Sequence, residues 1–378
     1  MMSFTVTARC AEARCGVLQT PHGPVETPVF MPVGTAGSIK GVTPNQLQRT
    51  GASIILANTY HLQLRPGAEV VAKLGGLHRF MNWSGPILTD SGGYQAFSLT
   101  GLTNITDDGV EFQSHIDGAH LRLDPEIAIR VQNLLGADII MAFDQCPPLP
   151  SNAEELRVAV DRSIQWARRC RTAHAREDQA LFGIVQGGLD VDLRKKCASA
   201  LVAMGFDGYA IGGLSVGETH EQMAAVLPEV ASALPNNRPR YLMGVGMPRD
   251  ILAAVRAGVD MFDCVLPTRN GRNSYAFTAD GPLKLRNQQY QLDDRPLEPG
   301  CDCEACLGFS RAYLRHLFNA GEMLGPTLAS IHNLRFYQRF MERMRQLIRE
   351  GNLARIMTEF PIVGEQRASL DLEEAEPA

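Results

Sequence analysis

Residues 261–272 read Met-Phe-Asp-Cys-Val-Leu-Pro-Thr-Arg-Asn-Gly-Arg. This stretch combines a predicted strand with a candidate catalytic residue. The stretch begins as an apolar run and places one carboxylate, Asp263, where that run ends. A polar segment follows with a proline, a glycine and two arginines, Arg269 and Arg272, and it is predicted to be a loop. Guanidinium groups hold phosphates in fixed geometry while a nearby carboxylate attacks or takes up a proton. The simpler interpretation is a carboxylate that caps a turn or forms an ion pair.

Similar short apolar runs recur along the chain. Together with this one they occupy residues 29–33, 53–57, 86–88, 139–143, 181–185, 209–211, 241–245 and 261–266. Segments with helical spacing of apolar residues lie between them, at 44–49, 69–74, 125–135, 153–171, 193–204, 220–234 and 249–257. Short runs without alternation are typical of strands buried on both faces. Such strands alternating with helices predict an α/β protein with a (β/α)8 barrel. A doubly wound sheet is the alternative, but no Gly-x-Gly-x-x-Gly motif follows the first strand.

The two ends of the chain depart from this pattern. Residues 1–28 contain short alternating runs broken by proline and glycine, which predicts an N-terminal antiparallel β ribbon. Residues 300–335 carry clustered cysteines and are predicted to form a metal-binding subdomain within a single catalytic unit, 1–378. The acidic tail, 368–378, is expected to be disordered.

Composition narrows the class of protein. The chain has 378 residues, 45% hydrophobic content and a net charge of -5, which suits one large core and argues against a general nucleic-acid coat. No apolar run approaches the roughly 20 residues of a membrane span, and the N-terminus lacks a signal-peptide core, so a cytoplasmic protein with no membrane partner is expected. Nine cysteines without an export signal are expected to be thiols or metal ligands.

Three carboxylates follow predicted strands, namely Asp90, Asp144 and Asp263. Barrel active sites lie at the C-terminal ends of the strands, so these residues are expected to converge at one mouth lined by glycine-rich loops. Asp90 opens the sequence Asp-Ser-Gly-Gly-Tyr, in which it can serve as an acid or base. The backbone of Ser91, Gly92 and Gly93 can then hold polar ligand atoms, and Tyr94 can stack on a base. The alternative is a turn cap followed by a packed tyrosine.

Other residues near this mouth suit a nucleobase. Asp144 can accept hydrogen bonds from N1–H and the exocyclic amine of a guanine, and Gln186 offers both a donor and an acceptor. Met243 can cover one face of the base, although a strand methionine is more often plain core. Cys146 is interpreted as a lining residue because nothing beside it lowers its pKa. The alternative for Asp144 is a helix or turn cap.

The cysteines near the C-terminus suggest a zinc site. Cys301, Cys303 and Cys306 with one histidine suit tetrahedral, structural zinc, of which one per chain is predicted. Spacing alone leaves His316 and His332 both open as the fourth ligand. Free surface thiols are the alternative. The arginine-rich segment 311–349 that follows is either a solvated helix face or a surface for RNA phosphates.

Taken in order, these motifs resemble the bacterial-type tRNA-guanine transglycosylases of the queuine tRNA-ribosyltransferase family. The likeness rests on segments 89–95, 141–146, 182–187, 211–215, 241–246, 262–272 and 301–306 with His332. It runs from about residue 30 to 335 and implies the barrel with a zinc insertion. The implied reaction is base exchange at the wobble position of tRNAs with a G-U-N anticodon, those for Asp, Asn, His and Tyr. Guanine leaves and 7-aminomethyl-7-deazaguanine enters, in queuosine biosynthesis, and the implied assembly is a homodimer.

The resemblance also implies roles for individual residues. Asp263 is the nucleophile on the ribose C1′, and Asp90 is the general acid/base. The implied base-binding set is Tyr94, Asp144, Gln186, Gly213, Leu214 and Met243, with Ser91, Gly92, Gly93 and Cys146 lining the pocket. The implied RNA-binding set is Gly244, Val245, Gly246, Met247, Pro248, Arg249, Asp250, Thr268, Arg269, Asn270, Gly271 and Arg272. The implied zinc ligands are Cys301, Cys303, Cys306 and His332.

This chemistry is coherent on physical grounds. Exchange without hydrolysis requires the sugar to be held covalently between two displacements, as in retaining glycosidases. The base must also leave its stack, at a cost of a few kcal/mol. A carbohydrate-active barrel would share the carboxylates but does not explain the two arginines. A non-catalytic RNA-binding subunit would lack Asp263 or Asp90, and this chain has both.

Overall fold

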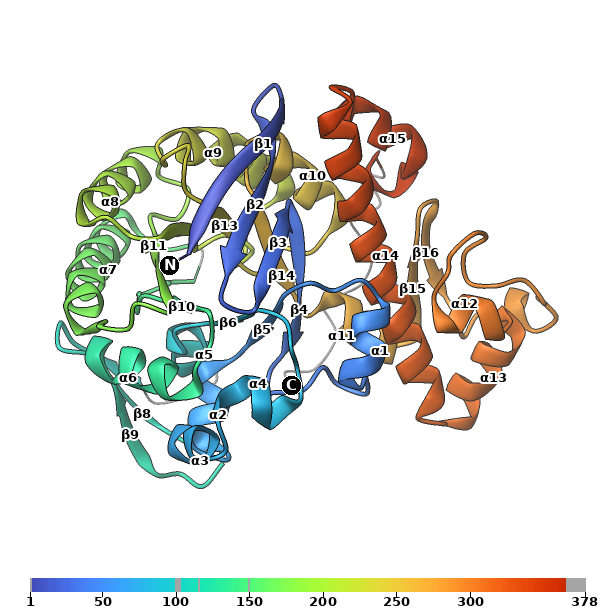
Figure 1. Cartoon of the computed structure of the whole chain (residues 1–378), viewed down its shortest axis with the longest axis horizontal. Coiled ribbons are helices and arrows are strands. Elements are labelled where there is room, and N and C mark those ends of the chain that lie inside the picture. Colours follow the sequence, from blue (N-terminus) through green and yellow to red (C-terminus); the bar gives the residue numbers. More distant parts are fainter. Residues whose placement is uncertain (1, 99–102, 115, 149, 365–378) are drawn as a thin grey trace.

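The short apolar runs of the sequence form a closed barrel of eight parallel strands in the computed structural model of the chain (Figure 1). The structure describes residues 2–98, 103–114, 116–148 and 150–364, so the predicted tail lies outside it. In barrel order the strands are β4 (Val29–Gly34), β5 (Ile55–Ala57), β6 (Ile87–Thr89), β10 (Ile139–Met141), β11 (Ala180–Val185), β12 (Gly208–Ile211), β13 (Arg240–Leu242) and β14 (Met261–Cys264). Each coincides with one predicted run, so the barrel prediction is confirmed.

Helices connect these strands, and the sequence-predicted ones are all present. They are α1 (Pro44–Arg49), α3 (Ala68–Lys73), α6 (Pro125–Leu135), α7 (Ala153–Ala173), α8 (Val191–Met204), α9 (His220–Ser232) and α10 (Pro248–Arg256). Local sequence explains where several of them begin. Thr43, Asn152 and Thr219 each form a capping box at the start of a helix. Asp124 caps α6, whose first residue is a proline.

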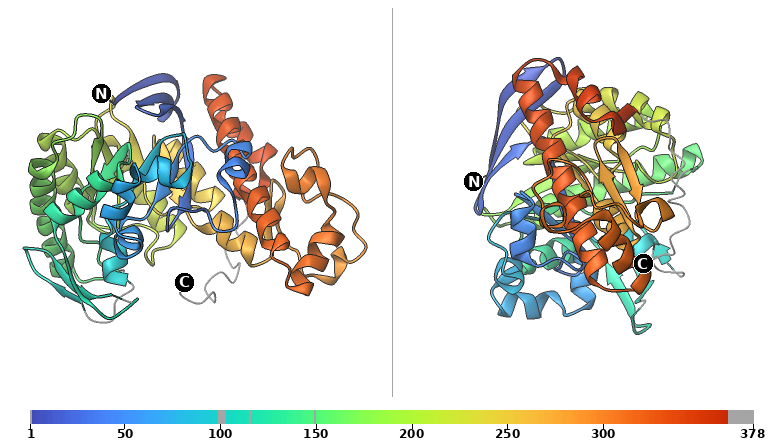
Figure 2. Two further views of the ribbon diagram at one scale, coloured as in Figure 1. Left: turned by 60° about the horizontal axis from the view of Figure 1, so that its bottom comes forward. Right: turned by 90° about the vertical axis from the view of Figure 1, so that its right-hand side faces the viewer.

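Several elements were not predicted. Short helices α2 (Thr59–Leu64), α4 (Gly76–Met81) and α5 (Gly93–Ser98) flank β6, and a sheet of β7 (Thr103–Ile105), β8 (Val110–Gln113) and β9 (His120–Leu123) precedes α6. A hairpin of β15 (Tyr275–Thr278) and β16 (Gly281–Lys284) precedes α12 (Glu304–Gly308) and α13 (Arg311–Ala320). The helix predicted over 331–349 is confirmed as part of α14 (Leu324–Arg349). The described residues close with α15 (Ile356–Glu359), and short 3-10 turns are η1 (Gln288–Tyr290), η2 (Leu353–Arg355) and η3 (Pro361–Gly364). Figures 1 and 2 show α14 between the barrel and the hairpin with α12 and α13.

One end of the barrel is closed by the N-terminal ribbon. It is a three-stranded antiparallel sheet of β1 (Ser3–Cys10), β2 (Ala13–Thr20) and β3 (Gly23–Thr27), lying across the barrel (Figure 1). Leu18 and Val25 from this sheet join a buried cluster with the inward side chains of the strands, among them Leu88, Ile184 and Met261. The ribbon therefore plugs the barrel, and the opposite end remains as the mouth.

The segment after β14 corrects a prediction. Residues Leu266–Arg272 form a helix, α11, and not the predicted loop. Pro267 stands in the first turn, where its fixed φ favours a helix. Gly271, which suggested a turn, is instead a packing glycine, because a Cβ there would lie 2.7 Å from the backbone nitrogen of Ser330 in α14. A close helix–helix approach, invisible to local sequence patterns, explains this glycine.

Within the described residues, no helix combines the length and the apolar character needed to cross a membrane.

Candidate active site

Strand alternation brings the predicted site residues to the mouth. Leu88, Ile184, Tyr241 and Met261 all belong to the cluster inside the barrel. Side chains two residues apart on a strand share a face, so Asp90, Gln186, Met243 and Asp263 come next on the same inner side. The apolar side chains inside the barrel are thus followed, at the mouth, by side chains that include Asp90, Gln186 and Asp263.

Asp263 is held asymmetrically. Its Oδ1 accepts a hydrogen bond from the Tyr241 hydroxyl, with an O–O distance of 2.5 Å, and another from the Gly244 backbone N–H at 2.8 Å. No hydrogen bond between described residues reaches Oδ2. Burial raises the pKa of Asp263, while the two donors oppose that shift. One oxygen is therefore anchored and the other is left for a reacting atom.

Asp90 lies in a network of neutral donors. Its Oδ2 accepts from Asn58 Nδ2 at 2.5 Å and Gln95 Nε2 at 2.9 Å, and its Oδ1 accepts from the Thr59 backbone N–H at 2.7 Å. Burial raises the pKa of Asp90 to about 6, against the effect of these donors, and the charge of Asp263 raises it further. A buried carboxyl with a pKa near neutrality is suited to passing protons in both directions.

Asp144 and Gln186 form the third part of the mouth. Gln186 Nε2 donates to Asp144 Oδ2 at 2.6 Å, and Ser91 Oγ lies 3.5 Å from Oδ1. Burial raises the pKa of Asp144 to about 6 despite these donors. Gln186 Oε1 is buried without a hydrogen-bond partner among the described residues. An acceptor carboxylate beside an unsatisfied amide oxygen can bind a heterocycle edge that carries N–H donors.

Glycine is required beside Gln186. A Cβ on Gly213 would lie 2.3 Å from Gln186 Oε1, and the φ of Gly213 is +62°. Arg194 from α8, fully buried, fixes this loop, because it donates from Nη1 to the Gly212 carbonyl and from Nη2 to the Gly213 carbonyl, each at 3.0 Å. Sequence patterns did not single out Arg194, and they did not single out Asn58, Gln95 or Tyr241 as site residues. The only signal for Arg194 was a cation in a helix with an apolar face.

The remaining predicted base-binding residues differ in burial. Leu214 is buried, Met243 is partly buried against the barrel cluster, and the Tyr94 side chain is 51% exposed on α5. Gly93 packs closely, since a Cβ there would lie 3.1 Å from the Asp144 carbonyl oxygen. Burial raises the pKa of the Cys146 thiol to about 12, which agrees with a lining role and excludes a thiolate.

The predicted RNA-binding residues fall into two groups. Buried side chains or glycines form the first group: Val245, Gly246, Pro248, Thr268, Asn270 and Gly271. They shape the rim, as where the Tyr337 hydroxyl of α14 donates to the Gly246 carbonyl at 2.6 Å. The exposed or partly exposed group is Gly244, Met247, Arg249, Asp250, Arg269 and Arg272. Arg272 Nη1 is buried without a hydrogen-bond partner among the described residues. Burial and the charge of Arg269 lower the Arg272 pKa, which marks a crowded, under-neutralised cationic pair.

Most arginines of the C-terminal segment 311–349 form ion pairs within the chain. Arg335 pairs with Asp302, Arg339 with Glu298 and Arg343 with Glu359. Arg345 and Arg349 both pair with Glu26 in the ribbon. These guanidiniums are occupied within the chain, so the surface for RNA phosphates that the sequence left open is not supported there.

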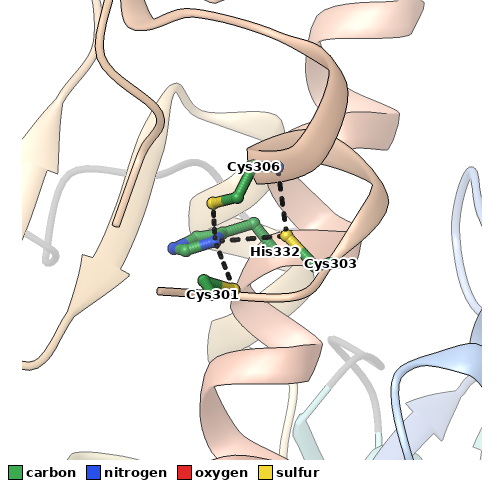
Figure 3. Close-up of side chains that lie close together, drawn as sticks. All are labelled: Cys301, Cys303, Cys306 and His332. Carbon is green, nitrogen blue, oxygen red and sulfur yellow. Dashed lines mark hydrogen bonds between the residues drawn. The ribbon is translucent and has the colours of Figure 1, made fainter. Parts of the chain in front are cut away.

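The cysteine cluster is assembled around His332 (Figure 3). Its Nδ1 lies 3.8, 3.6 and 3.3 Å from the sulfurs of Cys301, Cys303 and Cys306. The Nε2 side of the ring lies 2.8 Å from the Phe277 carbonyl oxygen, which fixes a tautomer with Nδ1 free to bind a metal. All four ligand atoms lie within 4.8 Å of one another and can hold a metal ion. His316 is exposed on α13 and is not part of the cluster, so the structure decides between the two histidines.

The family model described as queuine tRNA-ribosyltransferase matches residues 9–362. A queuine tRNA-ribosyltransferase of Halothermothrix orenii is 54% identical over 348 residues, covering 92% of this chain and 93% of the relative. One of Pelotomaculum thermopropionicum is 54% identical over 361 residues, covering 95% and 98%. One of Methylobacillus flagellatus is 51% identical over 359 residues, covering 95% and 97%. The chain therefore belongs to the queuine tRNA-ribosyltransferase family.

Proposed function

We propose that this protein replaces the wobble guanine of G-U-N tRNAs with 7-aminomethyl-7-deazaguanine by double displacement at Asp263. The observation that carries this proposal is the asymmetric anchoring of Asp263, with Oδ1 held by two donors and Oδ2 free of hydrogen bonds from described residues. Oδ2 attacks the ribose C1′, the bond from C1′ to guanine N9 breaks, and an ester joins enzyme and RNA. The entering base then attacks C1′ through its own N9 and releases the carboxylate.

Asp90 is assigned the proton transfers. It gives a proton to the departing guanine and takes one from the entering base, which returns the site to its starting state. Its pKa of about 6 supports this role, because both protonation states are accessible near neutral pH. The charge of Asp263 is one of the causes of that pKa, so the two carboxylates are coupled electrostatically.

Asp144, Gln186 and the Gly213–Leu214 backbone are assigned to the base. Asp144 accepts from N1–H and the exocyclic amine, which both the leaving and the entering base carry, so the same contacts serve both half-reactions. Val216 is partly buried near this loop, and we infer that its side chain excludes a bulkier base such as queuine. Val216→Gly should use queuine better relative to the aminomethyl base. Equal use of the two bases by the wild-type protein would contradict this inference.

The test of the nucleophile uses a denaturing gel. Enzyme is mixed with a G-U-N tRNA and a base analogue that traps the intermediate, and labelled guanine incorporation is measured in parallel. Asp263→Asn should still bind tRNA but give neither a shifted band nor exchange. The matched control is Asp294→Asn, an exposed aspartate in the segment before the cysteines, which should behave as wild type. A covalent band of normal intensity with Asp263→Asn would assign the attack to another residue.

We propose that the Cys301, Cys303, Cys306 and His332 cluster holds one structural zinc ion per chain. Three thiolates and a neutral imidazole are the ligand set of closed, tetrahedral zinc sites, and the Phe277 carbonyl supplies the outer contact such a histidine needs. Bound zinc would tie α12 to α14. Cys306→Ser should lower the metal content and loosen residues 300–335 while leaving Asp263 in place. Metal analysis of freshly purified protein without zinc would refute the assignment.

We infer that the protein works in the cytoplasm as a homodimer, with one subunit catalysing and the other positioning the tRNA. Leu292, Leu307 and Met323 support an interface near the metal subdomain, because these apolar side chains are 92%, 76% and 85% exposed. Light scattering at micromolar concentration should give twice the chain mass. A monomer under those conditions, still active in exchange, would refute the dimer.

A further inference from the structure

Arg194, near the start of α8, is a fully buried cation without a carboxylate partner among the described residues. Burial lowers the pKa of Arg194 to about 10, so the group stays charged at neutral pH. The Glu218 carboxylate opposes this shift from beyond ion-pair distance, since its oxygens accept from the Ser215 and Val216 backbone N–H groups. Arginine is almost never fully buried unless it is paired, because an unpaired buried charge costs stability. Its presence here therefore indicates a role in the site beside it.

Backbone carbonyls take the place of a carboxylate around Arg194. They follow two neighbouring parallel strands, β11 and β12. Arg194 Nε donates to the Gly188 carbonyl, after β11, at 2.6 Å. Its Nη1 and Nη2 donate to the Gly212 and Gly213 carbonyls, after β12, at 3.0 Å each. One guanidinium therefore holds together the two loops on either side of the base site.

The bond to the Gly212 carbonyl determines where the next N–H points. The C=O and N–H groups of a trans peptide point in opposite directions, so the Gly213 N–H is turned away from Arg194. Burial raises the pKa of the Cys146 thiol to about 12, and the Gly213 N–H is among the contacts that oppose this shift. Gln186 is equally near, because a Cβ on Gly213 would lie 2.3 Å from its Oε1. The Gly213 N–H thus faces the residues assigned to the base.

The edge of a guanine carries three adjacent groups that fit this arrangement. In the proposed function, Asp144 accepts from the exocyclic amine and from N1–H. The next group along the same edge is the oxo oxygen, which is an acceptor. Gln186 donates to Asp144 on one side and lies against Gly213 on the other, so the Gly213 N–H is the donor in place for that oxygen.

We propose that Arg194 is a positioning residue for base exchange, which orients and polarises the Gly213 N–H as a donor to the oxo oxygen of the base. This inference rests on the proposed function, because it takes guanine as the leaving base. When the bond from C1′ to N9 breaks, its electron pair stays with the guanine. Negative charge then spreads to the oxo oxygen until Asp90 supplies a proton.

A preorganised donor at the oxo oxygen stabilises the charge that develops there. The guanidinium of Arg194 on the far side of the same peptide strengthens this donor, because linked hydrogen bonds polarise one another. Arg194 therefore acts through the peptide and does not touch the base.

The experiment compares guanine with 6-thioguanine as entering bases for the wild type, Arg194→Met and Arg194→Lys. 6-Thioguanine keeps both N–H groups that face Asp144 but replaces the oxo oxygen by sulfur, a weak acceptor. The wild type should favour guanine in kcat/KM. In Arg194→Met this preference should shrink by roughly three- to ten-fold, the equivalent of one hydrogen bond, while the KM for tRNA stays unchanged. Arg194→Lys keeps the charge but lacks the planar fork that reaches both loops, so its preference should lie in between.

The matched control is Arg14→Met, which alters another arginine with 0% exposure, at the closed end of the barrel. It should lose stability but keep the wild-type preference for guanine. A preference lowered equally in Arg14→Met and Arg194→Met would indicate general loosening and overturn the inference. An unchanged preference in both Arg194 variants, or an equal rise in KM for base and tRNA, would overturn it too.

If Arg194→Met does not fold, Arg194→Lys decides between these outcomes by the same ratio. Failure of the proposed function would appear separately, as absent guanine exchange by the wild-type protein.

Discussion

The two ends of the barrel use buried carboxylates in opposite ways. Asp138 and Asp260 each stand one residue before a strand, at the end closed by the ribbon. Asp260 accepts from Arg14 Nε at 2.9 Å and Nη2 at 2.5 Å, and from the Arg240 backbone N–H at 2.7 Å. Asp138 lies 2.7 Å from His22 Nδ1 and 3.1 Å from His78 Nε2, and it accepts from the Ile87 N–H. Both oxygens of Asp138 and both oxygens of Asp260 therefore have a partner.

At the mouth, polar atoms are left without partners. The described residues provide no hydrogen bond to Asp263 Oδ2, Gln186 Oε1 or Arg272 Nη1. The pKa of Asp138 differs in direction from those of Asp90 and Asp144 at the mouth, whereas burial raises the pKa of Asp260 at the closed end despite the Arg14 charge. Burial raises the pKa of Asp90 and Asp144 to about 6. Burial also acts on Asp138, but hydrogen bonds from His78, His22 and Ile87 outweigh it and lower its pKa. Asp138 and Asp260 are fully bonded and stabilise the closed end, whereas unsatisfied acceptor and donor atoms at the mouth are available to a ligand.

The His22, His78 and Asp138 cluster belongs to the stabilising end. Its ligand atoms lie close enough to suggest a metal site, but the two imidazole rings are stacked, with centroids 3.6 Å apart and planes inclined by 14°. Nearly parallel rings direct their nitrogen lone pairs along parallel lines, which cannot meet at one ion. A carboxylate that bridges two rings explains the arrangement, and it ties the ribbon turn to the barrel.

The strongest test of this contrast is Asp90→Asn. Exchange should fall by about 10²–10⁴-fold because the proton transfers are lost. The same change should make the protein more stable at neutral pH. A folded-state pKa of about 6, above the unfolded value near 4, means that the folded state binds more protons between these pH values. Wild-type stability therefore falls as pH rises from about 4 to 6, by on the order of 3 kcal/mol at most. Urea unfolding of both proteins from pH 4 to 7 measures this, and a variant less stable at pH 7 would contradict it.

Arg14→Met tests the closed end. Removing one partner of a buried ion pair leaves Asp260 charged and unpaired, and should cost about 3–5 kcal/mol of unfolding free energy. Turnover per folded molecule should stay near the wild-type value, since no residue at the mouth changes. The matched variant is Arg14→Met with Asp260→Asn, which removes the charge and should recover part of the loss. Reduced turnover with unchanged stability would reverse the roles assigned to the two ends.

Tyr241→Phe should have an intermediate effect. A hydrogen bond to a charged group contributes about 1.5–3 kcal/mol, so its loss should raise the pKa of Asp263 by about one to two units. The acid limb of the exchange rate against pH should move upward by that amount, and the rate should recover at higher pH. Tyr209→Phe, in the neighbouring strand β12, is the control and should leave the profile in place. An equal loss at every pH would show that Tyr241 acts only in packing.

The smallest effect is expected for His22→Ala. The His22 side chain is 39% exposed, so its contact with Asp138 should contribute only about 0–1 kcal/mol. The lowered pKa of Asp138 adds stability above its unfolded pKa, near 4, and that stability is lost as pH falls through the folded pKa. The difference between wild type and variant should therefore vanish in acid. A measurable change in the base-exchange rate at neutral pH would show that the closed end influences the mouth. It would contradict the separate roles assigned to the two ends.

Local sequence was sufficient for the main elements of the barrel and for much of the site. All eight barrel strands, and the helices α1, α3 and α6 to α10 between them, follow from apolar runs, helical spacing and caps, whereas α2, α4, α5 and the sheet of β7 to β9 were not predicted. Two-residue alternation was also sufficient to turn Asp90 and Asp263 to the inner side of the barrel. These features depend on residues close together in the chain, where backbone geometry and burial set the pattern.

Contacts between distant segments were decided only by the tertiary structure. They include the choice of His332 over His316, the pairing of Arg345 and Arg349 with Glu26, and the packing of α11 on α14 that explains Gly271. The free oxygen of Asp263 belongs with them, because Tyr241 and Gly244 on the neighbouring strand and its loop select which oxygen is held. Hydrogen-bond partners and close approaches depend on where the closed barrel brings separate strands and helices together. No local periodicity of the sequence determines which distant segments come into contact. The sequence therefore predicted the types of residue at the site but not which of them pair.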